Sequence, residues 1–372
     1  MSEWKIRFGT AGTSDSFTAM GYKNSLDIPA YTEKMGLDAF EYQCGHGVRL
    51  GLDKARQMAD DAAARGILFS VHAPYYISAS SLDEEKRLNS VNYLLQSAAL
   101  CRALGGRRVI FHSGSCGRQS REAALEKALD TLKRAQDALD EAGFAEITLC
   151  PETMGKIGQL GTLEEVLALC GVDRRITPCI DFGHLNARTL GGIQTKADYA
   201  AILDRMAEVL GDDRARQFHV HFSRIEYSKG GEKRHWTFAE TQFGPEPQPL
   251  MELLAERGLA PVIICESAGT QAEDAETMKR FFEACLCTTS QSGLRPPAPL
   301  VGEPLAKRFT EIGCQGLPSL GEVALRSNDG EVSLQQAQCF LIGHKDAVGV
   351  HLQDGARALG GHRAGDDRLD CL

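Results

Sequence analysis

LFSVHAP (68–74) and RRVIFHS (107–113) are two short apolar runs in which a histidine stands near the end. Both are rich in β-branched and aromatic residues, which is typical of strands buried on both faces. Six more runs of this kind occur in the first 286 residues: KIRFGT (5–10), AFEYQ (39–43), EITLCPE (146–152), TPCIDF (177–182), QFHVHF (217–222) and PVIICES (261–267). Amphipathic stretches separate the eight runs, so the sequence predicts an α/β fold of the (β/α)8 TIM-barrel type.

The segments between these runs carry helix signals. The sequences SLDE (81–84), TLEE (162–165) and TQAE (270–273) fit the capping box that begins a helix. Apolar residues repeat on one face from residue 120 to residue 142, which predicts a long helix. A doubly wound open sheet is the alternative α/β fold, but the glycine-rich GxGxxG phosphate loop is missing after the first strand.

Residues 287–372 differ in composition from the predicted barrel domain, residues 1–286. They contain no Trp or Tyr, twelve glycines in 86 residues, and only Phe309 and Phe340 as aromatic residues. So few large apolar side chains can hardly offset the entropy lost on ordering. We therefore expect a disordered C-terminal extension, with a small second domain as the alternative.

The overall composition is that of a soluble globular protein, with 43% hydrophobic and 24% charged residues. A net charge of −9 argues against a surface coated with basic residues. No apolar run approaches the ~20 residues of a membrane span, and the N-terminus lacks the apolar segment of a signal peptide. The twelve cysteines form no CxxC pair, which favours reduced thiols. We expect a monomeric, cytoplasmic protein.

Potential metal ligands stand at the ends of six consecutive predicted strands: His72, His112, Glu152, Asp181, His221 and Glu266. His184 and His235 lie in the loops after the sixth and seventh strands, and His219 lies one layer deeper than His221. In TIM barrels these strand ends form the active-site face. Carboxylates at this density would repel one another unless cations neutralised them. The mixture of imidazole and carboxylate favours Zn²⁺, with Mn²⁺ or Fe²⁺ as alternatives.

A set of motifs in the barrel region resembles a known family. They are VHAPYY (71–76), FHSGS (111–115), PETMGKIGQLG (151–161), IDFGH (180–184), VHFS (220–223), KRHW (233–236) and CES (265–267). Together they resemble endonuclease IV, the zinc-dependent apurinic/apyrimidinic endonuclease family of DNA repair. The resemblance follows the barrel in order and ends near residue 286, although the wider superfamily also includes sugar isomerases and epimerases.

The resemblance implies a first zinc held by His72, His112 and Glu152. It implies that Glu152 bridges to a second zinc, which Asp181, His221 and Glu266 also hold. His184 and His235 match the histidines of the family's third zinc, but the family's aspartate position is Lys233 here. We therefore expect two metal ions rather than three, unless Glu232 or a water molecule serves as a substitute ligand. Either Lys233 replaces the third ion as a positive charge, acting in catalysis beside Glu152 and Glu266, or it points into solvent.

Tyr75 and Tyr76 match the family positions that insert into DNA at an abasic site, which implies a role in substrate binding. Possible phosphate contacts in the loops after strands five to seven are Lys156, Arg188, Arg224 and Lys229. The function that the resemblance implies is hydrolysis of damaged double-stranded DNA at the phosphodiester 5′ to an abasic site. The alternatives are a metal-dependent sugar or sugar-phosphate isomerase or epimerase, and a barrel that binds metal or nucleic acid without turnover.

Overall fold

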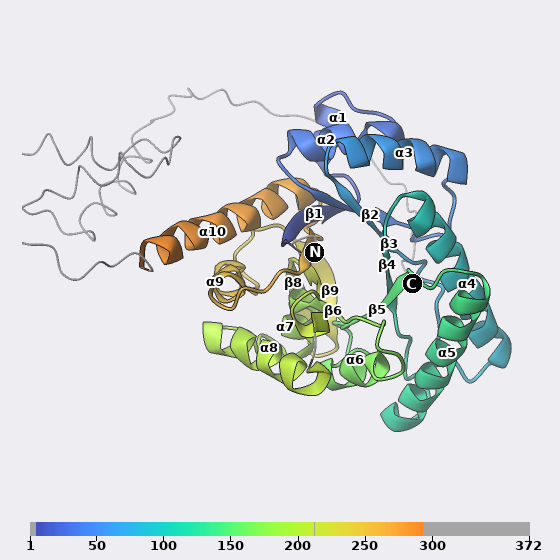
Figure 1. The fold of residues 1–372 in the computed structure, drawn as a ribbon. Coiled ribbons are helices and arrows are strands. Elements are labelled where there is room, and N and C mark those ends of the chain that lie inside the picture. The colour runs from blue at the N-terminus through green and yellow to red at the C-terminus, as the bar shows by residue number, and fades with distance from the viewer. Residues whose placement is uncertain (1–4, 212, 293–372) are drawn as a thin grey trace, which may run out of the picture. The chain divides into compact units, whose positions relative to one another are not determined.

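The computed structural model describes residues 5–211 and 213–292. Eight parallel strands close into a barrel in the order β1-β10-β7-β6-β5-β4-β3-β2, and helices surround it (Figure 1). The barrel strands are β1 (Arg7–Ala11), β2 (Ala39–Gln43), β3 (Leu68–His72), β4 (Arg108–His112), β5 (Thr148–Glu152), β6 (Cys179–Asp181), β7 (His219–Phe222) and β10 (Val262–Cys265). Each lies within or overlaps one of the eight predicted runs, so the predicted TIM barrel is confirmed.

The helices follow the strands around the barrel. They are α1 (Asp15–Ala19), η1 (Ser25–Asp27), α2 (Ile28–Lys34), α3 (Leu52–Ala64), α4 (Glu84–Ala103), α5 (Arg121–Glu141), α6 (Leu163–Cys170), α7 (Phe182–Arg188), α8 (Lys196–Leu210), η2 (Asp213–Ala215), α9 (Gln248–Glu256) and α10 (Gln271–Ser292). The predicted long helix is α5, and the capping box at Thr162 and Glu165 begins α6 as predicted. The predicted box at residues 81–84 is wrong, because Asp83 caps α4 by accepting from the Glu85 N–H.

Side chains alternate between the two faces of each barrel strand. On β4, Val109 and Phe111 belong to the main core between strands and helices, whereas Ile110 lies in a small cluster with Cys150 and Cys179. We assign that small cluster to the barrel interior. The interior layer near the carboxyl ends of the strands is polar instead, and it contains the predicted metal ligands.

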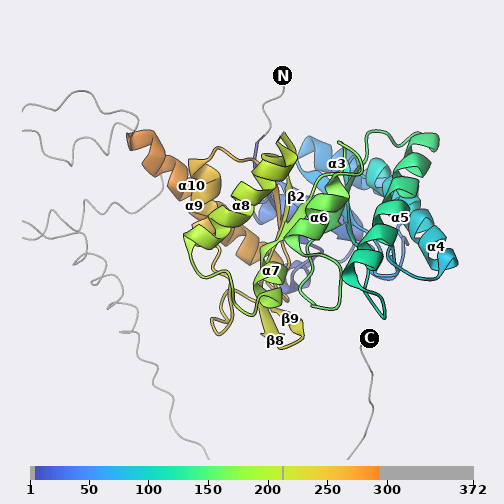
Figure 2. The ribbon, with the colours of Figure 1, turned by 90° about the horizontal axis from the view of Figure 1, so that it is seen from below.

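A two-stranded antiparallel hairpin follows β7 directly, and the sequence analysis did not predict it. It consists of β8 (Arg224–Ser228) and β9 (Gly231–Trp236), and it projects from one end of the barrel (Figure 2). Gly231 has φ of 90°, and a Cβ there would lie 2.2 Å from the carbonyl oxygen of Gly155. Only glycine allows this approach, which fixes the hairpin against the loop after β5.

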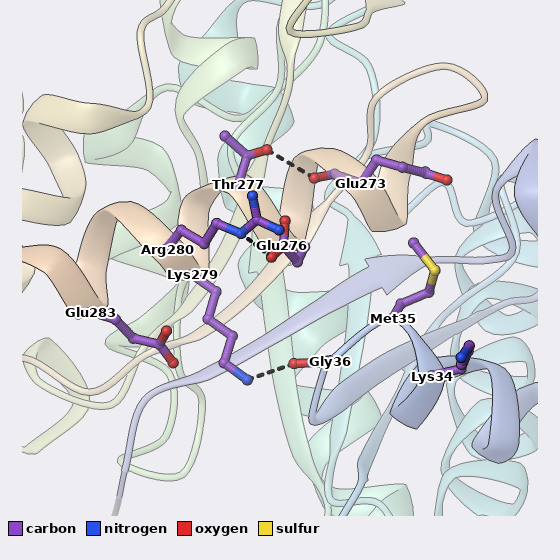
Figure 3. Close-up of a pocket in the computed structure, with 9 residues that line it drawn as sticks. All are labelled: Lys34, Met35, Gly36, Glu273, Glu276, Thr277, Lys279, Arg280 and Glu283. Carbon is purple, nitrogen blue, oxygen red and sulfur yellow. Dashed lines mark hydrogen bonds and ion pairs between the residues drawn. The ribbon is translucent and has the colours of Figure 1, made fainter. Parts of the chain in front are cut away.

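The last helix, α10, packs beside the end of α2. Lys279 donates to the Gly36 carbonyl at 2.5 Å, and a groove lies between the two helices (Figure 3). None of the residues that line this groove is a predicted metal ligand. The predicted domain boundary at residue 286 falls inside α10, and the rest of the predicted extension, residues 293–372, lies outside the described residues. Among the helices of the described ranges, none has the length and apolar character to cross a membrane.

Candidate metal centre

The six predicted strand-end ligands converge at the carboxyl end of the barrel. Five of them are the last residue of a strand or lie one residue before its end, and Glu266 follows β10 directly. Glu152 and Asp181 are completely buried, as is His221, while Glu266 is 15% exposed at its side chain. The barrel therefore concentrates three carboxylates and several imidazoles in a site nearly closed to water.

Glu152 lies at the middle of this site. Its Oε2 atom is 3.3 Å from His72 Nε2 and 3.2 Å from His112 Nε2. Its Oε1 atom is 2.9 Å from His221 Nδ1 and 3.3 Å from His184 Nδ1. Burial acts to raise the pKa of Glu152, but the charge of His221 and the hydrogen bonds from the other imidazoles hold it well below its usual value.

Two potential ligand groups share Glu152. His72, His112 and Glu152 form the first, and Glu152, Asp181, His221 and Glu266 form the second, with the ligand atoms of each group within 4.8 Å of one another. These are the two sets that the resemblance to endonuclease IV implies, and the structure brings the residues of both together.

The donor atoms of the second group fit a cation. Asp181 Oδ2 is buried, and its 3.0 Å contact with His184 Nδ1 lacks hydrogen-bond geometry, so this anionic oxygen can still bind a metal ion. Burial raises the pKa of Glu266, and repulsion by Glu152 and Asp181 adds to the rise despite the nearby His221. A bound divalent cation would relieve both features.

A third potential group consists of His184, Glu232 and His235. Asp181 caps α7 by accepting from the His184 N–H at 2.8 Å, which fixes the start of the helix that carries His184. The Nε2 atom of His184 lies 3.3 Å from Glu232 Oε2, and His235 Nε2 lies 3.9 Å from Glu232 Oε1. Ser223 Oγ is 2.8 Å from His235 Nδ1 and orients that ring.

Lys233 is not part of this group, so of the two predicted alternatives the structure agrees with the one in which Lys233 points into solvent, and not with a catalytic charge in place of the third ion. Its ammonium pairs with Glu226, and its side chain is 52% exposed. The reason is a β-bulge in the backbone register of the hairpin. Glu226 lies opposite Arg234 and Tyr227 lies opposite Glu232, so Lys233 is the extra residue with no register partner on β8. The extra residue places Glu232 and His235 on the same face. Glu232 is therefore the potential ligand in place of the family's aspartate, the substitution that the sequence left open.

Tyr75 and Tyr76 lie in the loop after β3, and both are about half exposed. The Tyr75 ring centroid is 5.6 Å from that of His112 and 5.9 Å from that of His72. Tyr75 thus lies beside the first ligand group with an accessible face. Tyr76 contacts His46 and Tyr93 instead, farther from the metal ligands.

Two of the predicted phosphate contacts serve the protein itself. Arg188 donates to several backbone carbonyls of the loop after β5, among them those of Met154 and Gln159. Arg224 is 5% exposed and donates to Glu246 at 2.7 Å. Lys156 and Lys229 are exposed near the barrel mouth and remain available to a ligand.

The family model described as xylose isomerase-like TIM barrel matches residues 29–285. The chain belongs to this family. An uncharacterized protein of Methanocaldococcus jannaschii is 33% identical over 281 residues, covering 76% of this chain and 98% of that protein. A probable endonuclease 4 of Staphylococcus aureus is 27% identical over 193 residues, covering 50% of this chain and 61% of that protein. The predicted resemblance to endonuclease IV is thereby confirmed.

Solved structures of the xylose isomerase-like barrel agree in fold with this chain. Endonuclease IV from Thermus thermophilus has a TM-score of 0.53 at 20% identity, covering 76% of this chain and 99% of that one. An L-ribulose 3-epimerase has a TM-score of 0.57 at 18% identity, covering 79% of this chain and 100% of that one. At these identities the likeness concerns the fold, and it does not separate a nuclease from an epimerase.

Proposed function

We propose that this protein is a metal-dependent phosphodiesterase of the endonuclease IV type, which cleaves DNA 5′ to an abasic site and leaves a 3′-hydroxyl. The observation that carries the proposal is the arrangement of three adjacent ligand groups around Glu152 and His184. Adjacent divalent ions are typical of enzymes that transfer or hydrolyse phosphoryl groups. Zn²⁺ is the metal that the imidazole and carboxylate donors favour, with Mn²⁺ or Fe²⁺ as alternatives.

Bound metal ions would supply a hydroxide near neutral pH and positive charge for the phosphate oxygens. The protein's own groups then have separate tasks. Glu152 holds the first two ligand groups in one fixed relation through its contacts with His112 and His221. Glu266 is the most exposed carboxylate of the second group, so its Oε2 atom is the carboxylate oxygen best placed to accept the proton of the attacking water.

Tyr75 supports a nucleic-acid substrate. Its exposed ring lies beside His72 and His112, where it can stack on a deoxyribose or base displaced from the duplex. Lys156 lies in the loop after β5 and Lys229 in the turn between β8 and β9, and both are exposed and can contact the phosphate backbone.

A sugar isomerase or epimerase is the second candidate, and one observation favours it. Arg188 and Arg224 are committed to the protein's own carbonyls and carboxylates, so few cations remain at the barrel mouth for a polyanion. A small neutral sugar would not need them.

A direct assay distinguishes the two functions. The full chain, loaded with Zn²⁺ or Mn²⁺, is incubated with a duplex that contains one tetrahydrofuran abasic site, with an undamaged duplex, and with a panel of ketoses. We expect a 3′-hydroxyl fragment from the abasic duplex alone, lost with a chelator and restored by added metal. Epimerisation of a ketose without strand cleavage would replace the nuclease proposal by the second candidate.

A further inference from the structure

One buried carboxylate below the metal ligands has no part in the site described so far. Glu41 lies in the middle of β2 and is completely buried in the barrel interior. Its Oε1 atom lies 2.9 Å from His221 Nε2, and its Oε2 atom lies 2.9 Å from His219 Nε2. Ser70 Oγ also donates to Oε2, at 2.9 Å.

The two nitrogens of His221 face different partners. Nδ1 faces the second ligand group, 2.9 Å from Glu152 Oε1 and 3.4 Å from Glu266 Oε1. Nε2 faces Glu41. With Nδ1 facing the second ligand group, the other nitrogen of His221 lies within 2.9 Å of the Glu41 carboxylate. This contact is a close charge pair without full hydrogen-bond geometry, and Gln43 Nε2 donates to the same oxygen at 3.3 Å. Such an outer carboxylate fixes the tautomer and the ring orientation of a metal-binding histidine and increases its basicity.

Glu41 is a charged residue in a barrel interior that elsewhere contains apolar side chains, and this position needs an explanation. A buried carboxylate is costly unless it is paired, and Ile110, Ile264 and Cys150 show that this interior accepts apolar side chains. Among the described residues, the potential cations that touch Glu41 are His219 and His221. The carboxylate at this position therefore acts on the imidazoles of His219 and His221.

We propose that Glu41 is a positioning residue of the metal centre, which orients His221 and strengthens its bond to the second metal ion. Ser70 on the neighbouring strand β3 and His219 on β7 hold the Glu41 carboxylate in place through its Oε2 atom. The inference rests on the metal centre of the proposed function and does not depend on the substrate.

The test measures metal binding by the full chain. Glu41→Gln keeps the shape of the side chain and removes its charge. We expect a 10- to 100-fold loss of affinity for one Zn²⁺ equivalent in competition with a chromophoric chelator, and a changed visible spectrum of the Co²⁺-substituted protein. Ser70→Ala leaves the carboxylate in place but removes one of its donors, so we expect a smaller loss in the same direction.

Glu165→Gln is the matched control, because it neutralises another buried carboxylate in a helix cap remote from the ligands. It should lower thermal stability without changing Zn²⁺ affinity or the Co²⁺ spectrum. If Glu41→Gln does not fold, Glu41→Asp, which keeps the charge but retracts it, and Ser70→Ala take its place. Wild-type affinity and spectrum in the variants that fold would overturn the proposal. A protein that loses metal in Glu41→Gln but never cleaves abasic DNA would refute the proposed nuclease and leave this role standing.

Discussion

Glu232 Oε2 lies 3.3 Å from His184 Nε2, whereas the neighbouring Lys233 turns its ammonium to Glu226. The bulge in β9 thus replaces an expected cation by a carboxylate at the third ligand group. The charge of Asp181 and that of Glu232 raise the pKa of His184 well above its usual value, although burial opposes them. A group of two imidazoles and one carboxylate is a suitable cage for a divalent ion.

The first prediction concerns metal content. We expect three Zn²⁺ ions per chain in the wild type, in place of the two expected from the sequence. Glu232→Gln removes the anionic ligand of the third group, so its content should fall to about two. Elemental analysis after dialysis measures the change.

Lys233→Met serves as the matched control for this experiment, because it alters the adjacent residue without touching the ligands. Its metal content should equal that of the wild type. A wild type with two ions, or a Lys233→Met protein that gains one, would show that Lys233 does act on the third group.

The second prediction concerns Glu266. Glu266→Gln should lower kcat for abasic-site cleavage by about 10²–10⁴-fold, because the amide cannot accept the proton of the attacking water. Its circular dichroism should be unchanged, since Glu266 lies at the barrel mouth. Glu256→Gln, an equal loss of charge at an exposed position on α9, is the control. Cleavage by Glu266→Gln at the wild-type rate would contradict the assigned role.

The third prediction concerns salt. Binding of an abasic duplex should weaken as salt rises, even though the net charge is −9, because each lysine that meets a phosphate releases a counterion. Lys156→Ala and Lys229→Ala should each reduce the slope of log Kd against log salt by about one. Fluorescence anisotropy at several salt concentrations gives the slope. Affinity that does not vary with salt would favour a small-sugar substrate.

The strand-end ligands could be predicted from the sequence because their position depends on local features. A short apolar run that ends in His, Glu or Asp places that side chain at a known end of a parallel barrel. His72, His112 and Glu152 were found in this way, and the register of β4 with β5 pairs His112 with Glu152.

The placement of Glu232 at the third ligand group and the role of Glu41 could not be derived in the same way, for two physical reasons. A bulge shifts the alternation of side chains by one residue, and nothing in GEKRHW (231–236) indicates that Lys233 is the extra one. The proposed role of Glu41 depends on two histidines of β7, His219 and His221, and His219, 178 residues away in the sequence, meets Glu41 only when the barrel closes. The one available sign in the sequence was an acidic residue, Glu41, inside the otherwise apolar and aromatic strand AFEYQ (39–43).

The last prediction concerns stability, and it starts from Glu165 at the beginning of α6. Glu165 receives two hydrogen bonds from Arg121 and one each from the N–H groups of Gly161 and Thr162. Burial acts to raise its pKa, but these four donors lower it to about 2 from the usual 4.5. A carboxyl whose pKa is lower in the folded than in the unfolded protein stabilises the fold at pH values above its unfolded pKa. This stabilisation is lost as the pH falls through the pKa of the folded protein.

Glu165→Gln should therefore lower the free energy of unfolding at pH 7 by about 2 kcal/mol, allowing for solvent screening of the partly exposed Arg121. At pH 3 the difference should shrink to about half, because the carboxyl of the unfolded wild type is then mostly protonated and must lose its proton when the chain folds. Urea denaturation measures the free energy of unfolding of both proteins. A chelator is present throughout, so that loss of bound metal does not contribute to the difference. Glu164→Gln is the matched control: this neighbouring residue is exposed and pairs with Arg205 on the surface, so its change should stay within about 0.5 kcal/mol at either pH. A difference between Glu165→Gln and the wild type that is equal at pH 7 and pH 3 would mean that the ionised carboxylate does not supply the stability.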